Sequence, residues 1–197
     1  MGGYPTSSTI DGISSMINRH FARLGSDSFN GSVASLSVVN YGNSADFETV
    51  LTLASAVGIH FVVAAGNNAD DACNYFPARL GFDSDIVTVG STNVEDHRSH
   101  FSNYGPCIAV YAPGENIATT GPVGRMPEVL VSGTSFAVPH VSGLMAVFLS
   151  SDPTLRTAPD RMKAKIIDMA LSFEQDELQL DSFDLGLLVK NGKDQRA

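Results

Sequence analysis

The segment Ile59–Ala65 is almost uninterruptedly apolar, and it limits the possible folds more than any other stretch. A strand with one face in water alternates apolar and polar residues, whereas a continuous apolar run predicts a strand covered on both faces. Helical spacing of apolar residues in Ser8–Phe21 and Asp46–Val57 precedes it, and Gly58 predicts where the second helix ends. Alternating helices and strands predict an α/β fold, with a mostly parallel sheet and helices on both faces.

The remaining segments fit the same plan. We expect three further strands and two further helices: strands Val33–Val39, Ile86–Gly90 and Ile108–Tyr111, and helices Ser135–Leu149 and Pro159–Leu171. With 197 residues, the whole chain (1–197) is expected to form a single domain with a sizeable core.

Charge and composition argue against several kinds of partner. The formal net charge is −9, and Lys and Arg form no cluster, so neither nucleic acid nor an anionic membrane is expected as a partner. The apolar runs are judged too short to span a bilayer. The first residues, MGGYPTSS, lack the basic start and apolar stretch of a signal peptide, so export would need a leader that this sequence does not show.

The stretch Gly133–Gly143, GTSFAVPHVSG, has the features of a nucleophile site. Ser135 stands at the start of a predicted helix, where unpaired N–H groups and the positive end of the helix dipole favour an anion. A serine there can attack a carbonyl carbon while its own N–H holds the resulting oxyanion. A plain N-cap serine is the alternative. However, Pro139 and His140 are unusual inside an ordinary core helix.

The second informative stretch is Val62–Arg79, VVAAGNNADDACNYFPAR. Asn67 follows the buried strand at its carboxyl end, which is the edge where open α/β sheets place their sites. Its side-chain amide can donate a hydrogen bond to an oxyanion, although an Asn after a Gly is also common in plain turns. If both residues serve one site, the Asn67 and Ser135 side chains must converge on one cleft.

Together these two stretches resemble the subtilisin-like serine proteases, and AAGNN followed by NYFPA resembles their proteinase K branch. The resemblance implies a serine endopeptidase that hydrolyses peptides or proteins through an acyl-enzyme on Ser135. Asn67 and the Ser135 N–H would be the oxyanion donors. The stretch FSNYGPCIAVYAPG and the closing segment Phe183–Val189 match the family scaffold. In this family the position of His140 belongs to the helix packing and does not supply the catalytic base.

Two departures from the family pattern concern the substrate and a metal. Ser37, Val38 and Val39 stand where the family has the substrate-binding Ser-Leu-Gly, so valines occupy positions at which backbone must approach the substrate. We therefore expect a narrowed pocket or a shifted register. Ala109 stands at the position of a calcium-ligand aspartate, so no cofactor and no metal site are expected, although calcium is possible in the family.

Two features concern the compartment in which the protein folds. Two buried thiols are the plain interpretation of Cys73 and Cys107. The resemblance instead implies that they form a disulfide, because some proteinase K-like members pair cysteines at these places, and a disulfide indicates an oxidising compartment. Asn30–Ser32 is an N-glycosylation sequon, which is informative only if the chain is exported.

The family's Asp-Ser/Thr-Gly and His-Gly-Thr motifs, which carry the other two triad residues, are absent. The resemblance begins after the family's histidine helix, so we interpret the chain as the N-terminally truncated, C-terminal portion of a catalytic domain. A missing N-terminal segment or pro-segment would then be a partner. In the family fold that segment supplies strands beside Val33–Val39, whose edge is otherwise open to pairing. The remaining histidines are interpreted as surface or satisfied core residues: His20, His60, His97 and His100.

The leading hypothesis is a subtilisin-like endopeptidase, secreted in its full-length form, of which this chain alone is catalytically incomplete. An alternative is an inactive pseudo-protease that binds peptides or a partner protein through the remaining groove. A third is a serine esterase that uses His97 or His100 as its base. A longer reading frame with the Asp and His motifs would favour the first hypothesis.

Overall fold

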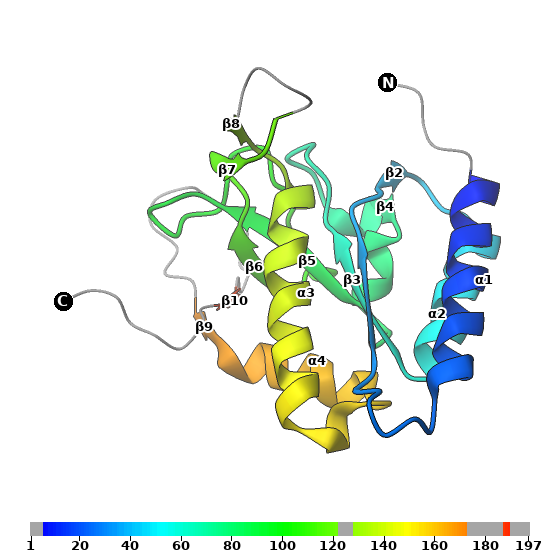
Figure 1. Ribbon diagram of the computed structural model, residues 1–197. Coiled ribbons are helices and arrows are strands. Elements are labelled where there is room, and N and C mark those ends of the chain that lie inside the picture. Colours follow the sequence, from blue (N-terminus) through cyan, green and yellow to red (C-terminus); the bar gives the residue numbers. More distant parts are fainter. Residues whose placement is uncertain (1–5, 122–127, 173–186, 190–197) are drawn as a thin grey trace.

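The computed structural model describes residues 6–121, 128–172 and 187–189 (Figure 1). Within them a central sheet has the strand order β1-β3-β5-β6-β10-β9. All neighbouring pairs are parallel except β10 and β9, which are antiparallel. The predicted α/β class with a mostly parallel sheet is therefore confirmed. The strand bounds are β1 Ser32–Leu36, β3 Ile59–Ala64, β5 Val87–Thr92, β6 Val110–Pro113, β9 Ala170–Ser172 and β10 Leu187–Val189.

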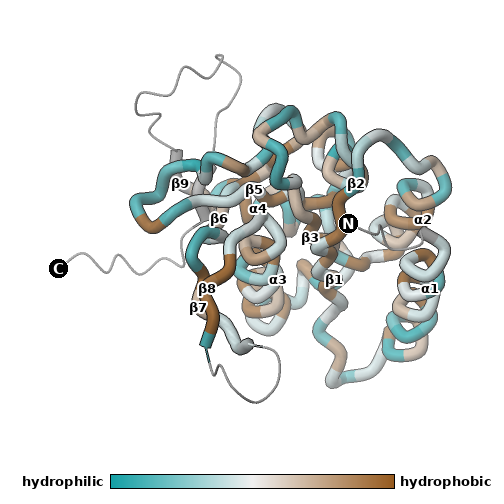
Figure 2. The backbone as a smooth tube through the Cα atoms, turned by 90° about the horizontal axis from the view of Figure 1, so that it is seen from above, coloured by the Kyte–Doolittle hydropathy of each residue, from teal (hydrophilic) through white to brown (hydrophobic). Residues whose placement is uncertain are grey.

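Helices cover both faces of this sheet, as the apolar strand predicted (Figure 2). Phe61 and Val63 of β3 pack with the two helices of one face, whereas Val62 and Ala64 pack with those of the other. Strand β3 is buried along its entire length, since successive side chains point to opposite faces and both faces are covered. The first face carries α1 (Thr6–Arg23) and α2 (Ala45–Ala56), and the second carries α3 (Thr134–Ser151) and α4 (Pro159–Met169).

Smaller elements lie mostly around the carboxyl edge of the sheet. Two short antiparallel ribbons pair β2 with β4 and β7 with β8. Their bounds are β2 Asn40–Tyr41, β4 Tyr75–Phe76, β7 Ile117–Thr119 and β8 Val129–Val131, and short 3₁₀ helices span Ala72–Asn74, Ala78–Gly81 and Pro153–Leu155.

Several predicted boundaries were wrong, and hydrogen bonds in the folded chain explain why. The strand expected to reach Val39 ends at Leu36, because Ser37 leaves the ladder and bonds to α3 instead. The strand expected from Ile108 begins at Val110, since the N–H of Ile108 closes a turn onto Gly105. Helix α4 ends two residues before the expected Leu171, where the chain pairs with β10. Of the predicted closing segment Phe183–Val189, the structure describes β10 and the rest lies outside the described residues.

Helix α3 corrects the expectation about membrane-spanning length. It is 18 residues long and apolar enough to cross a bilayer by length and composition, and it is the one such helix among the described residues. However, Ala137, Val141 and Met145 are buried against the strands of the sheet. We therefore interpret α3 as a core helix, whose apolar composition is explained by packing on the sheet.

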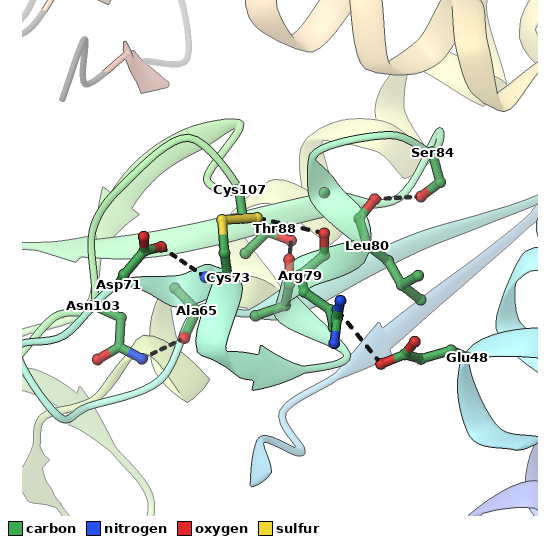
Figure 3. The surroundings of a disulfide bond; sticks show 12 residues. Glu48, Ala65, Asp71, Cys73, Arg79, Leu80, Ser84, Thr88, Asn103 and Cys107 are labelled. Carbon is green, nitrogen blue, oxygen red and sulfur yellow. Dashed lines mark hydrogen bonds and ion pairs between the residues drawn. A yellow bond between two sulfur atoms is a disulfide. The ribbon is translucent and has the colours of Figure 1, made fainter. Parts of the chain in front are cut away.

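The predicted disulfide between Cys73 and Cys107 is confirmed (Figure 3). The two Cα atoms lie 5.4 Å apart, and the bond closes a loop between residues 34 positions apart in sequence. Cys73 lies in the 3₁₀ helix after the β3 loop, and the Asp71 carboxylate accepts a hydrogen bond from its N–H. Cys107 is buried just before β6. The disulfide thus ties the loop after β3 to the segment that leads into β6.

Replacing both cysteines (Cys73→Ser with Cys107→Ser) should lower the free energy of unfolding by about 2–4 kcal/mol, because the unfolded chain regains the entropy of the opened loop. Urea denaturation followed by circular dichroism measures this change. Wild-type protein unfolded in the presence of a reductant is the control and should match the double variant. An unchanged urea midpoint in the double variant would contradict the prediction.

Candidate active site

Ser135 is the second residue of α3, so the expectation that it opens a helix is confirmed. Its side chain is half-buried and faces the segment that follows β1. The Ser135 hydroxyl donates to the backbone carbonyl of Ser37 over 3.4 Å. The first turn of a helix presents N–H groups without intrahelical partners, so Ser135 lies where a negative charge is stabilised.

Pro139 explains a second contact between these two serines. A helical carbonyl normally accepts from the N–H four residues later, but residue 139 is a proline and has no N–H to give to Ser135. The Ser37 hydroxyl donates to the Ser135 carbonyl instead, over 3.0 Å. The proline that was unusual for a core helix therefore frees a carbonyl that joins α3 to the end of β1.

Asn67 follows the buried strand β3 after Ala65 and Gly66, as the sequence predicted. Its side-chain oxygen accepts two hydrogen bonds from Thr134, one from the backbone N–H (2.8 Å) and one from the hydroxyl (2.9 Å). Asn67 is exposed, and because its oxygen is the acceptor of both bonds, its amide nitrogen keeps its capacity to donate. The structure thus brings Asn67 to the residue next to Ser135, although 67 positions separate Asn67 from Thr134.

Asn103 positions the Asn67 loop, and sequence reasoning missed it. This asparagine is fully buried, and its amide donates to the carbonyl of Ala65 over 2.8 Å (Figure 3). Its side-chain oxygen accepts from the N–H groups of Asn68 and Asp70, on either side of the turn. The only available signal was a polar residue within the FSNYG turn, and nothing local indicated that its partners lie more than 30 residues upstream.

Gly66 is required for this close packing. Its φ is +106°, and a Cβ there would overlap the amide of Asn103 and lie 3.3 Å from a methyl group of Val39. Val39 also packs against the buried cluster that contains Ala65 and Tyr75. Of the three residues predicted to bind substrate, Ser37 contacts Ser135, Val39 fills the space beside Gly66, and Val38 is half-buried between them in the chain. Their predicted role stays a prediction.

No histidine in the described part of the chain hydrogen-bonds to Ser135. His20 and His60 are buried, which lowers the pKa of both, and they contact Ser32 and the carbonyl of Arg156. His140 is exposed, contrary to the packing role implied for it, because its ring turns back to the carbonyl of Phe136 at 2.9 Å. The other two histidines lie in loops. The ring of His100 packs edge-on against the ring of Phe101, and the backbone N–H of His97 donates to the side-chain oxygen of Asn93.

The absence of a calcium site at Ala109 stays a prediction. Residue 109 offers no carboxylate, and its N–H pairs with the carbonyl of Thr88. Among the described residues no three His, Cys, Asp or Glu side chains are grouped so that they could hold a metal. The Lys163 ammonium group donates instead to the carbonyls of Gly81 and Ser84 in the loop before β5, over 2.7 Å each.

Comparisons with known proteins agree with this geometry. A family model described as "Subtilase family" matches residues 2–194. The chain is 40% identical over 171 residues to subtilisin-like protease 8 of Arthroderma otae, covering 83% of this chain and 34% of that protein. It is 38% identical over 171 residues to alkaline protease 2 of Aspergillus fumigatus, covering 83% of this chain and 33% of that protein. The chain thus spans about a third of the length of these curated relatives.

Solved structures give the same result. A crystal structure of a cold adapted subtilisin-like serine proteinase superposes with a TM-score of 0.76 at 30% identity, covering 95% of this chain and 62% of that chain. A protease from Pseudoalteromonas arctica superposes with a TM-score of 0.73 at 27% identity. The match covers 95% of this chain and 57% of that chain.

Replacing Thr134 by valine should lower the free energy of unfolding by about 2 kcal/mol, because the buried Oγ1 bonds to Asn67 and to the N–H of Gly66 are lost. Thr134→Ser keeps the hydroxyl and is the matched control, with a loss of less than about 1 kcal/mol expected for one methyl group. Urea denaturation measures both variants. Equal losses in the two would show that the hydroxyl does not matter.

Proposed function

Because this chain belongs to the subtilase family, we propose that the protein hydrolyses peptide bonds as a serine endopeptidase with Ser135 as its nucleophile. The observation that supports this role best is the double hydrogen bond from Thr134 to Asn67, which fixes an amide donor beside the amino end of α3. A fixed donor can stabilise developing negative charge without reorganising during the reaction.

The proposed reaction begins when the Ser135 Oγ attacks the carbonyl carbon of the scissile peptide bond. The negative charge that develops on the carbonyl oxygen is held by the Asn67 amide nitrogen and the Ser135 N–H. A base accepts the proton of the Ser135 hydroxyl and passes it to the leaving amine, and an acyl-enzyme on Ser135 remains until water hydrolyses it. Ser37, Val38 and Val39, which border Ser135 and Gly66, are proposed to contact the peptide or protein substrate.

This mechanism needs a base within hydrogen-bonding distance of Ser135, and none of the five histidines takes that place. A serine hydroxyl is a weak nucleophile at pH 7 unless an adjacent base accepts its proton. We therefore propose that residues 1–197 are catalytically incomplete by themselves, and that a segment with an Asp and a His motif completes the site.

A second candidate function follows from the same observation. A chain with a fixed oxyanion donor but no base could bind a peptide or a partner protein without cleaving it. For both candidates the disulfide supports folding in an oxidising compartment, so we propose that the protein is exported.

Residues 1–197 alone should label with a fluorophosphonate probe no faster than their Ser135→Ala variant, and should not hydrolyse casein above that background. Adding the upstream motif segment of a relative, by fusion or as a separate chain, should restore labelling at Ser135. In the completed enzyme, Asn67→Ala should lower kcat by about 100- to 1,000-fold, a range usual for loss of one oxyanion donor and exemplified by subtilisin itself.

These outcomes separate the hypotheses. Ser135-dependent hydrolysis by residues 1–197 alone would contradict the claim of incompleteness and would favour an esterase or protease that uses His97 or His100. Peptide binding without labelling, even after the upstream segment is added, would favour the binding function. Asn67→Asp is the control for shape, because it keeps the size of the side chain but removes its donor.

We further propose that Lys163 replaces a metal ion in the loop before β5. Two backbone carbonyls, of Gly81 and Ser84, accept from its ammonium group, and carbonyl oxygens of this kind are also ligands for hard cations. Burial lowers the pKa of Lys163, while Asp85 and Asp83 oppose that shift and favour its charged form. A positive charge supplied by the chain itself removes the need for calcium at this loop.

The unfolding temperature of wild-type protein should therefore be the same in millimolar calcium and in excess chelator. Lys163→Met should lower the free energy of unfolding by about 1–3 kcal/mol, because the two carbonyls lose their donor. Lys165→Met on the same helix is the control, since Lys165 pairs with Asp152 at a surface where ion pairs contribute little. A wild-type protein destabilised by chelator would contradict the proposal.

A further inference from the structure

The loop between α1 and β1 contains a motif that the proposed peptidase function does not use. Asn30, Gly31 and Ser32 form the only Asn-X-Ser/Thr triplet in the sequence. That triplet is the acceptor for N-linked glycosylation, but many such triplets are never modified. The environment of the Asn30 side chain therefore decides whether the folded protein can carry a glycan there.

The Asn30 side chain is exposed, and its oxygen is already engaged. Its Oδ1 accepts a hydrogen bond from the Arg156 guanidinium group over 2.7 Å. The amide nitrogen, to which a glycan is attached, has no hydrogen-bond partner among the described residues. A sugar on this nitrogen would leave the oxygen free to keep its bond to Arg156, so the modification is compatible with the observed side-chain geometry.

The backbone holds Asn30 at the surface. Gly31 has a φ of +117°, and a Cβ there would lie 2.9 Å from the carbonyl oxygen of Arg156 and 3.1 Å from Leu149. The loop is therefore pressed against the segment after α3, with Asn30 on its outer side. Ser32 begins β1, and its hydroxyl lies 3.0 Å from the buried ring of His20. In the folded protein this hydroxyl is engaged, so transfer of a glycan must precede folding.

There is room for a sugar at this place, and it is remote from Ser135. Asn30 lines a cavity of about 570 Å³ between α1 and the start of β1, within the usual size range of small-ligand sites. Figure 1 shows the loop before β1 at the opposite end of the sheet from the amino end of α3. Asn30 and Ser37 are seven positions apart, which is about 23 Å along an extended strand. A glycan here would not obstruct the candidate active site.

We propose that Asn30 carries an N-linked glycan, attached in the same oxidising compartment in which the disulfide forms. The donor is an oligosaccharide linked to a lipid pyrophosphate. A bond forms between the Asn30 amide nitrogen and C1 of the first sugar, while the bond from C1 to the pyrophosphate oxygen breaks. The amide nitrogen loses one proton, and the lipid pyrophosphate leaves.

The test expresses residues 1–197 behind a cleavable secretion leader in a yeast host and, separately, translates the same chain into microsomes. Endoglycosidase H should increase the gel mobility of the wild type by one step. Asn30→Asp keeps an oxygen facing Arg156 but cannot accept a glycan, so endoglycosidase H should not change its gel mobility. Ser32→Ala should also show no change, whereas Ser32→Thr preserves the sequon and should behave as the wild type.

Translation into microsomes does not depend on folding, so a variant that fails to fold still gives a result. Peptide mapping after release of the glycan by peptide N-glycosidase F, which hydrolyses the amide bond to the sugar, should find aspartate at position 30 in the wild type. The proposal is overturned if the wild type shows no mobility change in either system. It is also overturned if the change persists in Asn30→Asp. With either outcome, the role left for Asn30 is its hydrogen bond to Arg156.

Discussion

Burial of β3 on both faces is the constraint on which the rest of the structure depends. Ile59, Phe61 and Val63 point to one face of the sheet and need one layer of helices to cover them. Val62 points to the other face and needs a second layer. Each such side chain contributes about 1.5–3 kcal/mol when it is fully buried. The backbone of a strand so enclosed must find its hydrogen bonds in its neighbours, and β1 and β5 supply them on either side.

The burial of β3 also decides where polar side chains can gather, because they must lie beyond the ends of the buried strand. At the carboxyl end of β3 the chain leaves the core at Gly66, and its peptide groups need new partners there. Asn103 and Thr134 supply them, from segments that follow β5 and β8. Because both side chains are buried, their hydrogen bonds are shielded from water and hold one geometry. These bonds hold the backbone of the loop that carries Asn67.

The first strand of the sheet is held less completely. Among the described residues β1 pairs with β3 alone, so its other edge presents unpaired backbone groups. The end of this strand is joined to α3 by the reciprocal bonds between Ser37 and Ser135. A second strand laid along this edge would therefore adjoin Ser37, which contacts Ser135. The segment that we propose to complete the site would reach Ser135 along this edge.

The sequence by itself determined the α/β class and the positions of Ser135 and Asn67 on their elements, whereas the disulfide pairing was implied only by the family resemblance. These follow from local apolar patterns and from contiguous motifs, whose information lies within a few neighbouring residues. Only the tertiary structure decided that Pro139 frees a carbonyl for Ser37, that Asn103 braces the Asn67 loop, and that Lys163 holds two loop carbonyls. Each of these contacts joins residues 38 to 98 positions apart. No local pattern specifies such a partner, because which distant groups meet is fixed only when the layers pack.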